Sequence, residues 1–133
     1  MSVSNAIINI TNLRLRTYIG FNQEEREKKQ DIVINVEIVY ALNDAVLRDS
    51  VDDALNYKTI SKKIIQHVES GHFLLLEKLT ADILEICSDN NAVEFAEVTV
   101  DKPHALRFAD SVSLSLQHST KQGNNFQLLE KAS

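Results

Sequence analysis

The sequence has few of the residues on which several common kinds of site depend. It holds one cysteine, Cys87, so no disulfide can form within the chain, and a reducing compartment is expected. Its three glycines, Gly20, Gly71 and Gly123, lie far apart and build no phosphate-cradling loop. The four histidines show none of the usual metal-ligand spacings, so a zinc site is not expected.

Long apolar runs and an excess of positive charge are also missing. No run approaches the ~20 residues of a membrane-spanning helix, and the segment MSVSNAIINI lacks the basic start and long apolar stretch of a secretion signal. The formal net charge of -5 argues against an electrostatic hold on nucleic acid or on an anionic membrane. We therefore expect a cytoplasmic protein that binds neither, and in which a local cluster of basic residues would hold any anionic ligand.

Length and composition fit one ordinary globular domain. The chain has 133 residues, of which 44% are hydrophobic and 25% are charged, which is the usual size and composition of a single domain. We expect this domain to span residues 1–118. The segment 119–133 is polar except for Phe126, Leu128 and Leu129, and we expect a disordered tail or a short turn there.

Hydrophobic periodicity predicts four strands and two helices. Alternation of apolar and polar residues predicts strands over residues 6–17, 31–40, 93–101 and 110–118. The first strand has a slip near Thr11 that indicates a bulge. Helical spacing predicts one helix between an N-cap at Asn56 and a stop at Gly71, and a second from about Leu75 to the polar run SDNN.

The order strand, strand, helix, helix, strand, strand indicates an α+β fold. We expect a four-stranded antiparallel sheet with both helices on one face. Such a sheet keeps two open edges, and open edges favour closure by another subunit.

The stretch VTVDKPHALRFAD, residues 98–110, places a lysine in an unusual position. If the strand alternation continues, Lys102 follows Val98 and Val100 on the apolar face of the sheet. The commoner outcome for such a lysine is an ammonium group that extends to solvent. Alternatively, partial burial lowers the pKa of the amine from ~10.4 and makes it a usable general base. Pro103 has no N–H and is expected to end the strand.

Three further polar residues are candidates for a site. Glu77 follows four apolar residues at the start of the second predicted helix, where it either complements the helix dipole or binds the N–H groups of a planar aminopyrimidinone. Tyr57 lies on the apolar stripe of the first predicted helix, and Glu25 lies in the charged run QEEREKK. Taken alone, Tyr57 is typical of a core residue and Glu25 of a solvated loop.

Four stretches in this order, IGFNQEE, DALNYKTI, FLLLEKLTADIL and VTVDKPHA, together resemble the dihydroneopterin aldolase family. The resemblance covers about residues 6–118. It implies the tunnelling fold, in which subunits close their sheets into a tetrameric barrel and two barrels stack into an octamer with active sites at subunit interfaces. It also implies an enzyme of folate-related pterin metabolism that needs no metal and no cofactor.

The resemblance implies a role for each candidate residue. Glu77 would bind the amino and N–H groups of a pterin ring, and Lys102 would transfer the proton. Tyr57 would reach the site from a neighbouring subunit, and Glu25 would lie near the reacting side chain of the substrate.

Further contacts with the substrate are expected around these residues. Leu76 and, from the neighbouring subunit, Leu55 match positions that line the ring in the family. Arg107, His104 and Lys58 lie beside the implied site residues in the sequence, and we expect these basic side chains to hold a triphosphate.

Two activities of the family begin with the same bond cleavage. The C6=N5 imine of a dihydropterin is an electron sink, so removal of the 2′-hydroxyl proton breaks the C1′–C2′ bond. One activity releases glycolaldehyde and leaves 6-hydroxymethyl-7,8-dihydropterin, whereas the other retains the aldehyde and re-forms the bond with C2′ inverted. The stretches NLRLRTYIG, QDIVINVEI, IIQHVE and DKPHALRFADSVS resemble the family members that epimerise 7,8-dihydroneopterin triphosphate, so epimerisation is predicted first.

Two alternatives from other classes remain. A non-catalytic pterin-binding oligomer of this fold would be free to lose Lys102, Tyr57, Glu25 and Glu77, and their joint presence disfavours it. A zinc-dependent pterin synthase of the same fold is disfavoured because the sequence lacks a histidine cluster.

Overall fold

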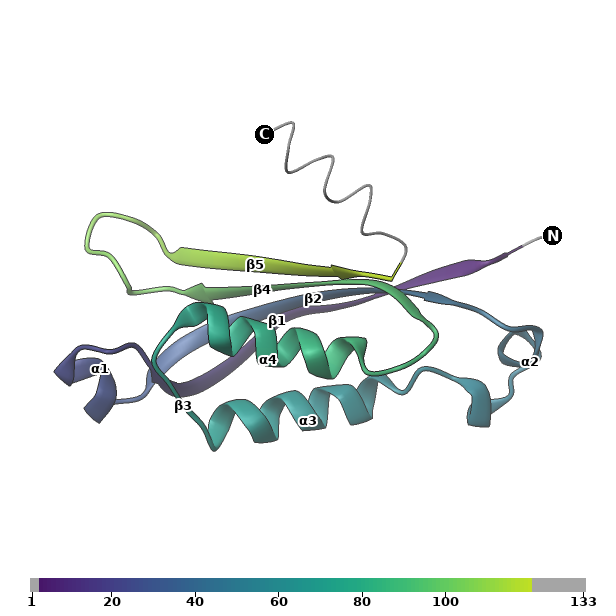
Figure 1. The fold of residues 1–133 in the computed structure, drawn as a ribbon, viewed down its shortest axis with the longest axis horizontal. Helices are drawn as coiled ribbons and strands as arrows, with labels where there is room; N and C mark the ends of the chain where they lie inside the picture. The colour runs from purple at the N-terminus through teal and green to yellow at the C-terminus, as the bar shows by residue number, and fades with distance from the viewer. Residues whose placement is uncertain (1–2, 121–133) are drawn as a thin grey trace.

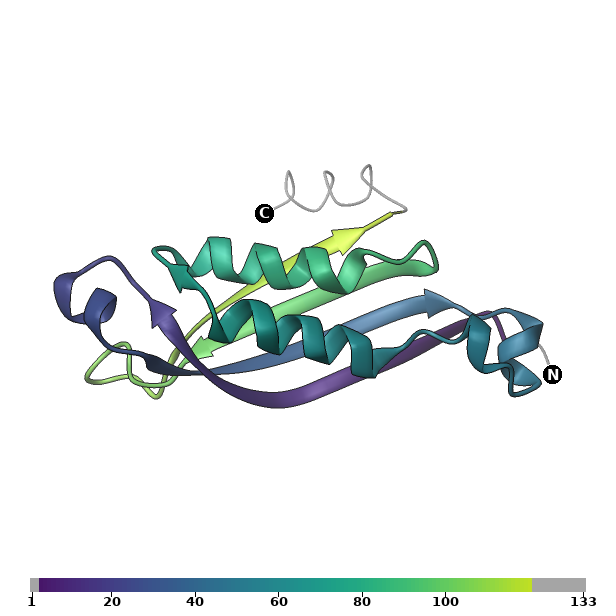
Figure 2. The same ribbon diagram turned by 90° about the horizontal axis from the view of Figure 1, so that it is seen from below.

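The computed structural model describes residues 3–120 and forms one sheet with two long helices on it. The elements in chain order are β1 (Asn5–Ile19), α1 (Gln23–Glu27), β2 (Gln30–Ala41), α2 (Asp44–Leu47), the 3-10 helix η1 (Val51–Asp53), α3 (Tyr57–Glu69), β3 (His72–Phe73), α4 (Leu76–Ser88), β4 (Val93–Lys102) and β5 (Val112–Ser119). The strand order in the sheet is β3-β1-β2-β4-β5. α3 and α4 lie side by side on the same face of the curved sheet, which confirms an α+β fold with both helices on one side (Figure 1, Figure 2).

The sheet has five strands and is mixed, so the predicted four-stranded antiparallel sheet is wrong. The additional strand, β3, pairs in parallel with Tyr18 and Ile19 at the end of β1. A strand of two residues is too short to show alternation, which is why periodicity does not predict it. The other four strands pair antiparallel, and they and the two long helices confirm the remaining predicted elements.

Short helices occupy two of the segments between the predicted elements. α1 lies between β1 and β2, and α2 and η1 lie between β2 and α3. No helix within residues 3–120 is both long and apolar enough to cross a membrane. The predicted tail lies outside the described residues from position 121 onward, and Ser119 still belongs to β5.

The predicted bulge in β1 is confirmed. The pairing with β2 shifts register between Ile10 and Leu13, and Asn12 adopts a φ of 55°, a left-handed conformation that asparagine tolerates better than most residues. The shift changes which residues of β1 face the helices: Ile8 and Ile10 pack against the core before the bulge, and Leu13 and Leu15 do so after it. One bulge therefore keeps a long strand apolar on its inner side.

The core lies between the sheet and the two helices. Most of its buried side chains come from one face of β2, of β4 and of each long helix: Ile32, Ile34, Val36, Ile38, Val93, Ala96, Val98, Val100, Ile60, Ile64, Val68, Leu79, Ile83 and Cys87. Burial raises the pKa of the Cys87 thiol to about 12, so this cysteine stays protonated and unreactive near neutral pH.

A buried hydrogen bond fixes the end of α3 to the end of β1. The Thr17 hydroxyl, which is fully buried, donates to the backbone carbonyl of Val68 at 2.6 Å. α3 has 13 residues, and a helix of that length spans about 20 Å. Its first residue, Tyr57, is therefore far from the end of the sheet to which Thr17 binds α3.

Candidate functional site

A lysine–glutamate ion pair lies at one end of the sheet. β4 ends at Lys102, directly before Pro103, as predicted. The Lys102 side chain is only 13% exposed, and its Nζ donates to Oε2 of Glu25 at 2.8 Å. The strand alternation thus continues to Lys102, and the commoner outcome, an ammonium group in solvent, is wrong for this chain. The lysine instead has a carboxylate partner from a segment 77 residues away.

Local structure holds Glu25 in position. Asn22 caps α1, and its Oδ1 accepts a hydrogen bond from the backbone N–H of Glu25 at 2.8 Å. The hydrogen bond from Lys102 lowers the pKa of Glu25 below its ordinary value, although burial acts in the opposite direction. The side chain is 23% exposed, so Glu25 is not the solvated loop residue that its charged surroundings suggest.

Gly20 is a part of this site that the sequence reading missed. Its φ is 130°, and a Cβ atom at this position would overlap the carboxylate of Glu25. Its N–H donates to the carbonyl of Phe73 at 2.9 Å and so joins the end of β1 to β3. An isolated glycine directly after a strand is the signal for such a close approach.

Leu76 and Glu77 begin α4 at the same end of the molecule. α4 starts shortly after β3, and β3 is bonded to Gly20, which contacts Glu25. The elements that carry Lys102, Glu25 and Glu77 therefore meet at one end of the sheet (Figure 1). Leu76 is partly buried against the core, whereas Glu77 is exposed. A carboxylate in this position is accessible to a ligand.

Tyr57, Lys58 and Leu55 lie at the opposite end. α3 begins near α2 and η1, so one copy of the chain does not bring Tyr57 to Lys102 (Figure 1, Figure 2). Tyr57 is 53% exposed and is no core residue. Leu55 is buried in the core of its own chain, and Lys58 is exposed in the first turn of α3.

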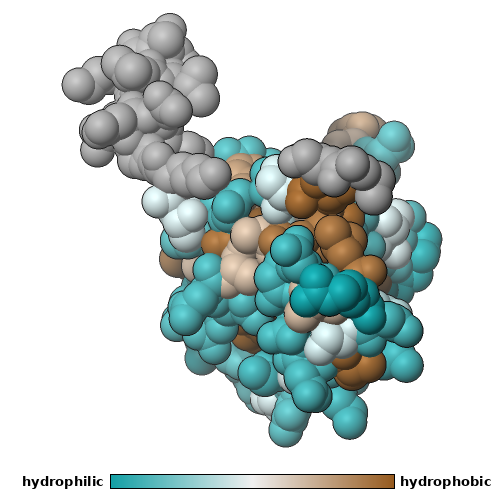
Figure 3. Space-filling view, turned by 90° about the vertical axis from the view of Figure 1, so that its right-hand side faces the viewer, coloured by the Kyte–Doolittle hydropathy of each residue, from teal (hydrophilic) through white to brown (hydrophobic). Residues whose placement is uncertain are grey.

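The end that carries α2 and η1 also exposes apolar side chains. Leu47 and Val51 are 52% and 83% exposed. Figure 3 looks onto this end, and apolar surface is visible there. These two exposed apolar side chains lie at the same end of the molecule as Tyr57.

His104 and Arg107 lie in the connection from β4 to β5. Both are exposed, and the Arg107 guanidinium lies 5.3 Å from the centre of the Phe108 ring. This connection begins directly after Lys102, so the two basic residues follow the ion pair closely along the chain.

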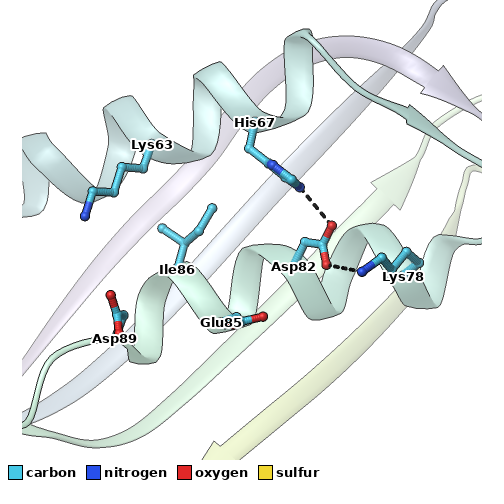
Figure 4. A pocket seen from close by; sticks show the side chains of 7 residues that line it. All are labelled: Lys63, His67, Lys78, Asp82, Glu85, Ile86 and Asp89. Carbon is cyan, nitrogen blue, oxygen red and sulfur yellow. Dashed lines mark hydrogen bonds and ion pairs between the residues drawn. The ribbon is translucent and has the colours of Figure 1, made fainter.

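A cavity lined by charged side chains lies elsewhere, in the groove between α3 and α4 (Figure 4). It has a volume of about 410 Å³, and Lys63, His67, Lys78 and Asp82 are among the residues that line it. Asp82 is 16% exposed and binds His67 at 2.8 Å and Lys78 at 2.9 Å. Although burial acts to raise it, these two hydrogen bonds lower the pKa of Asp82. His67 belongs to α3 and Asp82 to α4, so the contact between them joins the two helices.

A second cavity, of about 630 Å³, is lined by the residues that connect α3 to α4, from Ser70 to Leu75, and by side chains of both helices. It adjoins the segment that leads into Glu77. Within residues 3–120, no group of three or more His, Cys, Asp or Glu side chains is arranged to hold a metal ion.

Known proteins resemble this chain over most of its length. Residues 8–117 match the family described as dihydroneopterin aldolase (FolB). A dihydroneopterin triphosphate 2′-epimerase from Escherichia coli (strain K12) is 57% identical over 84% of this chain and 92% of its own length. An enzyme of the same name from Pseudomonas aeruginosa is 54% identical over 84% and 90%. Among solved structures, E. coli dihydroneopterin aldolase in complex with neopterin aligns with a TM-score of 0.78 and 25% identity, covering 86% of this chain and 99% of that one.

The ion pair can be tested by a change of charge without a change of shape. Glu25→Gln leaves the Lys102 ammonium without its partner in a mostly buried position. We expect the free energy of unfolding at pH 7, measured by urea denaturation, to fall by about 2 kcal/mol. Because the pKa of Glu25 is lowered on folding, the pair stabilises the protein above the ordinary value of 4.5 and loses this effect as the pH falls further. The difference between wild type and variant should therefore shrink below that pH.

Glu24→Gln serves as the control, because Glu24 is an exposed neighbour on the same helix. We expect it to change the free energy of unfolding by less than about 0.5 kcal/mol. A difference between wild type and Glu25→Gln that stays constant down to pH 3 would contradict the ion pair.

Proposed function

Because the chain belongs to the dihydroneopterin aldolase family, we propose that it epimerises 7,8-dihydroneopterin triphosphate at C2′ to 7,8-dihydromonapterin triphosphate. The observation that carries this choice is the 57% identity to a dihydroneopterin triphosphate 2′-epimerase, compared with 25% to a structurally similar aldolase. The second candidate is the aldolase reaction, which the fold similarity to that neopterin-bound aldolase supports. Both are enzymes of folate-related pterin metabolism.

The proposed reaction is a retro-aldol step followed by its reverse. The 2′-hydroxyl loses its proton, the C1′–C2′ bond breaks, and its electron pair moves into the C6=N5 imine, which becomes an enamine with a proton on N5. C2′ becomes an aldehyde and turns its other face to the enamine. The enamine then attacks the aldehyde, so the electron pair forms a new C1′–C2′ bond. N5 gives up its proton, and the new alkoxide on C2′ regains one. Substrate and product thus differ only in the configuration at C2′.

Lys102 is the proposed acceptor of the 2′-hydroxyl proton, directly or through a water molecule. As a base it acts in its neutral amine form, and its contact with Glu25 keeps the amine nitrogen in one position through the cycle. Glu77 would accept two parallel hydrogen bonds from the ring's amino and N–H groups, with Leu76 against the ring. Tyr57 would assist proton transfer at N5.

The proposal includes assembly into the barrel of the tunnelling fold. β5 is the last strand on one side of the sheet, and β3 covers only two residues of β1 on the other. Within residues 3–120, no further strand pairs with the outer edge of β5 or with the rest of the outer edge of β1, and such open edges favour pairing with another copy. Four copies would close one barrel, and two barrels would stack into an octamer. Tyr57 and Leu55, at the far end from Lys102, would then serve the site of a neighbouring copy.

The triphosphate would be held by basic side chains around this composite site. Arg107 and His104 follow Lys102 along the chain, and Lys58 would come with Tyr57 from the neighbour. A held triphosphate keeps the aldehyde fragment from diffusing away, so the bond can form again.

Product analysis tests the reaction itself. Incubation of the wild type with 7,8-dihydroneopterin triphosphate should give an isomer of unchanged mass that separates by chromatography. Lys102→Met should lower kcat by at least about 100-fold, because the proton acceptor is lost. Lys62→Met, at an exposed position of α3, should leave kcat unchanged. Release of mainly free aldehyde and a hydroxymethyl pterin would favour the aldolase reaction instead.

Mixed oligomers test whether two copies build one site. Lys102→Met and Tyr57→Ala subunits should each be nearly inactive alone. When the two are co-expressed and assembled at random, about a quarter of the sites combine an intact Lys102 with an intact Tyr57. We therefore expect the kcat of the mixture, per site, to recover to about a quarter of the wild-type value. Activity no higher than the sum of the two separate variants would argue that each site lies within one chain.

The role of Arg107 can be separated from catalysis by the choice of substrate. Arg107→Gln should raise KM for the triphosphate by about tenfold, because one charged contact to phosphate is lost. KM for 7,8-dihydroneopterin without phosphates should not change, and this substrate is the internal control. An equal effect on both substrates, or on neither, would remove Arg107 from the triphosphate site.

A further inference from the structure

Gln30, the first residue of β2, makes two contacts for which the proposed mechanism gives no role. Its Nε2 donates to the backbone carbonyl of Ile19 at 2.5 Å and to Oε2 of Glu25 at 3.3 Å. The same carboxylate oxygen accepts the hydrogen bond from Lys102 at 2.8 Å. One carboxylate oxygen of Glu25 therefore links the Gln30 amide to the Lys102 ammonium group.

The orientation of the Gln30 amide follows from its partners. The carbonyl of Ile19 and the carboxylate of Glu25 are both acceptors, and only the NH₂ group of an amide can donate to two acceptors at once. If the amide turned over, its own oxygen would face both. The Gln30 backbone is held in the sheet opposite Thr17 of β1. The side chain thus fixes the Glu25 carboxylate relative to the ends of two strands.

We propose that Gln30 is a positioning residue, which holds the Glu25 carboxylate where it keeps the Lys102 amine directed at the substrate. This inference rests on the proposed function, because Gln30 would act on the reaction only through Lys102. After the hydrogen bond from Lys102, the bond from Gln30 also contributes to the lowered pKa of Glu25. Loss of the amide should therefore raise that pKa.

Two substitutions at Gln30 and one control test the role. Gln30→Met removes both donors at similar length, and Gln30→Glu sets acceptor oxygens against two acceptors. Gln23→Met is the matched control, because Gln23 also donates to a glutamate, Glu27, at 3.3 Å, but on the exposed side of α1. The measurements are kcat and KM for the triphosphate across pH, and the titration of the Glu25 carboxyl by ¹³C NMR.

Gln30→Met should lower kcat on the order of tenfold and leave KM within about twofold. The Glu25 carboxyl of this variant should titrate at a higher pH than in wild type, because one hydrogen bond to its charged form is lost. Gln30→Glu should lose more activity, and Gln23→Met should behave as wild type. If the role of Gln30 were purely structural, Gln30→Met would lower stability without changing the titration of Glu25.

A Gln30→Met enzyme with wild-type kcat overturns the inference. So does one whose kcat falls while Glu25 titrates as in wild type, because the amide then acts by another route. If circular dichroism shows that Gln30→Met does not fold, the nearly isosteric Gln30→Glu takes its place in both measurements. If the wild type converts neither the triphosphate nor the dephosphorylated substrate, the proposed function fails. The Glu25 titration then decides alone whether Gln30 holds the carboxylate.

Discussion

A lysine ammonium that is almost removed from solvent needs a carboxylate, and much of the structure around Lys102 serves to supply one. Burying a charged amine without a partner costs several kcal/mol, so the end of β4 depends on Glu25. Glu25 comes from a five-residue helix, which is too short to be stable alone. The Asn22 cap and the ion pair hold that helix in place. The ion pair and the short helix α1 therefore stabilise each other.

The need to hold Glu25 beside Lys102 also explains the close packing at this end of the sheet. Gly20 has no side chain because the Glu25 carboxylate lies where a Cβ would be. Its N–H bonds to β3, the two-residue strand that leads into α4 and so sets where Glu77 begins. A displaced carboxylate would disturb both the lysine and this connection. Sequence segments far apart are thus linked through one carboxylate.

Sequence reasoning predicted the features that depend on periodicity and missed those that depend on single contacts. The four longer strands, the bulge, both long helices and the direction of Lys102 follow from alternation and spacing. β3 has two residues and no period, and Gln30 looks like any polar residue at a strand start. The partner of Lys102 lies 77 residues away, and no local pattern joins them. Only the family resemblance predicted that Glu25 and Lys102 belong to the same site; periodicity did not predict it.

The shared first step explains why the residues around Lys102 cannot by themselves distinguish epimerisation from cleavage. After the C1′–C2′ bond breaks, the aldehyde either turns and reacts again or leaves the site. A difference of about 1.4 kcal/mol between these two barriers changes their ratio tenfold. One charged hydrogen bond to a phosphate supplies an energy of that size. In the proposed mechanism, Lys102 removes the proton that starts the cleavage, a step common to both reactions. The side chains that contact the departing aldehyde fragment, away from the ion pair, would therefore determine the product.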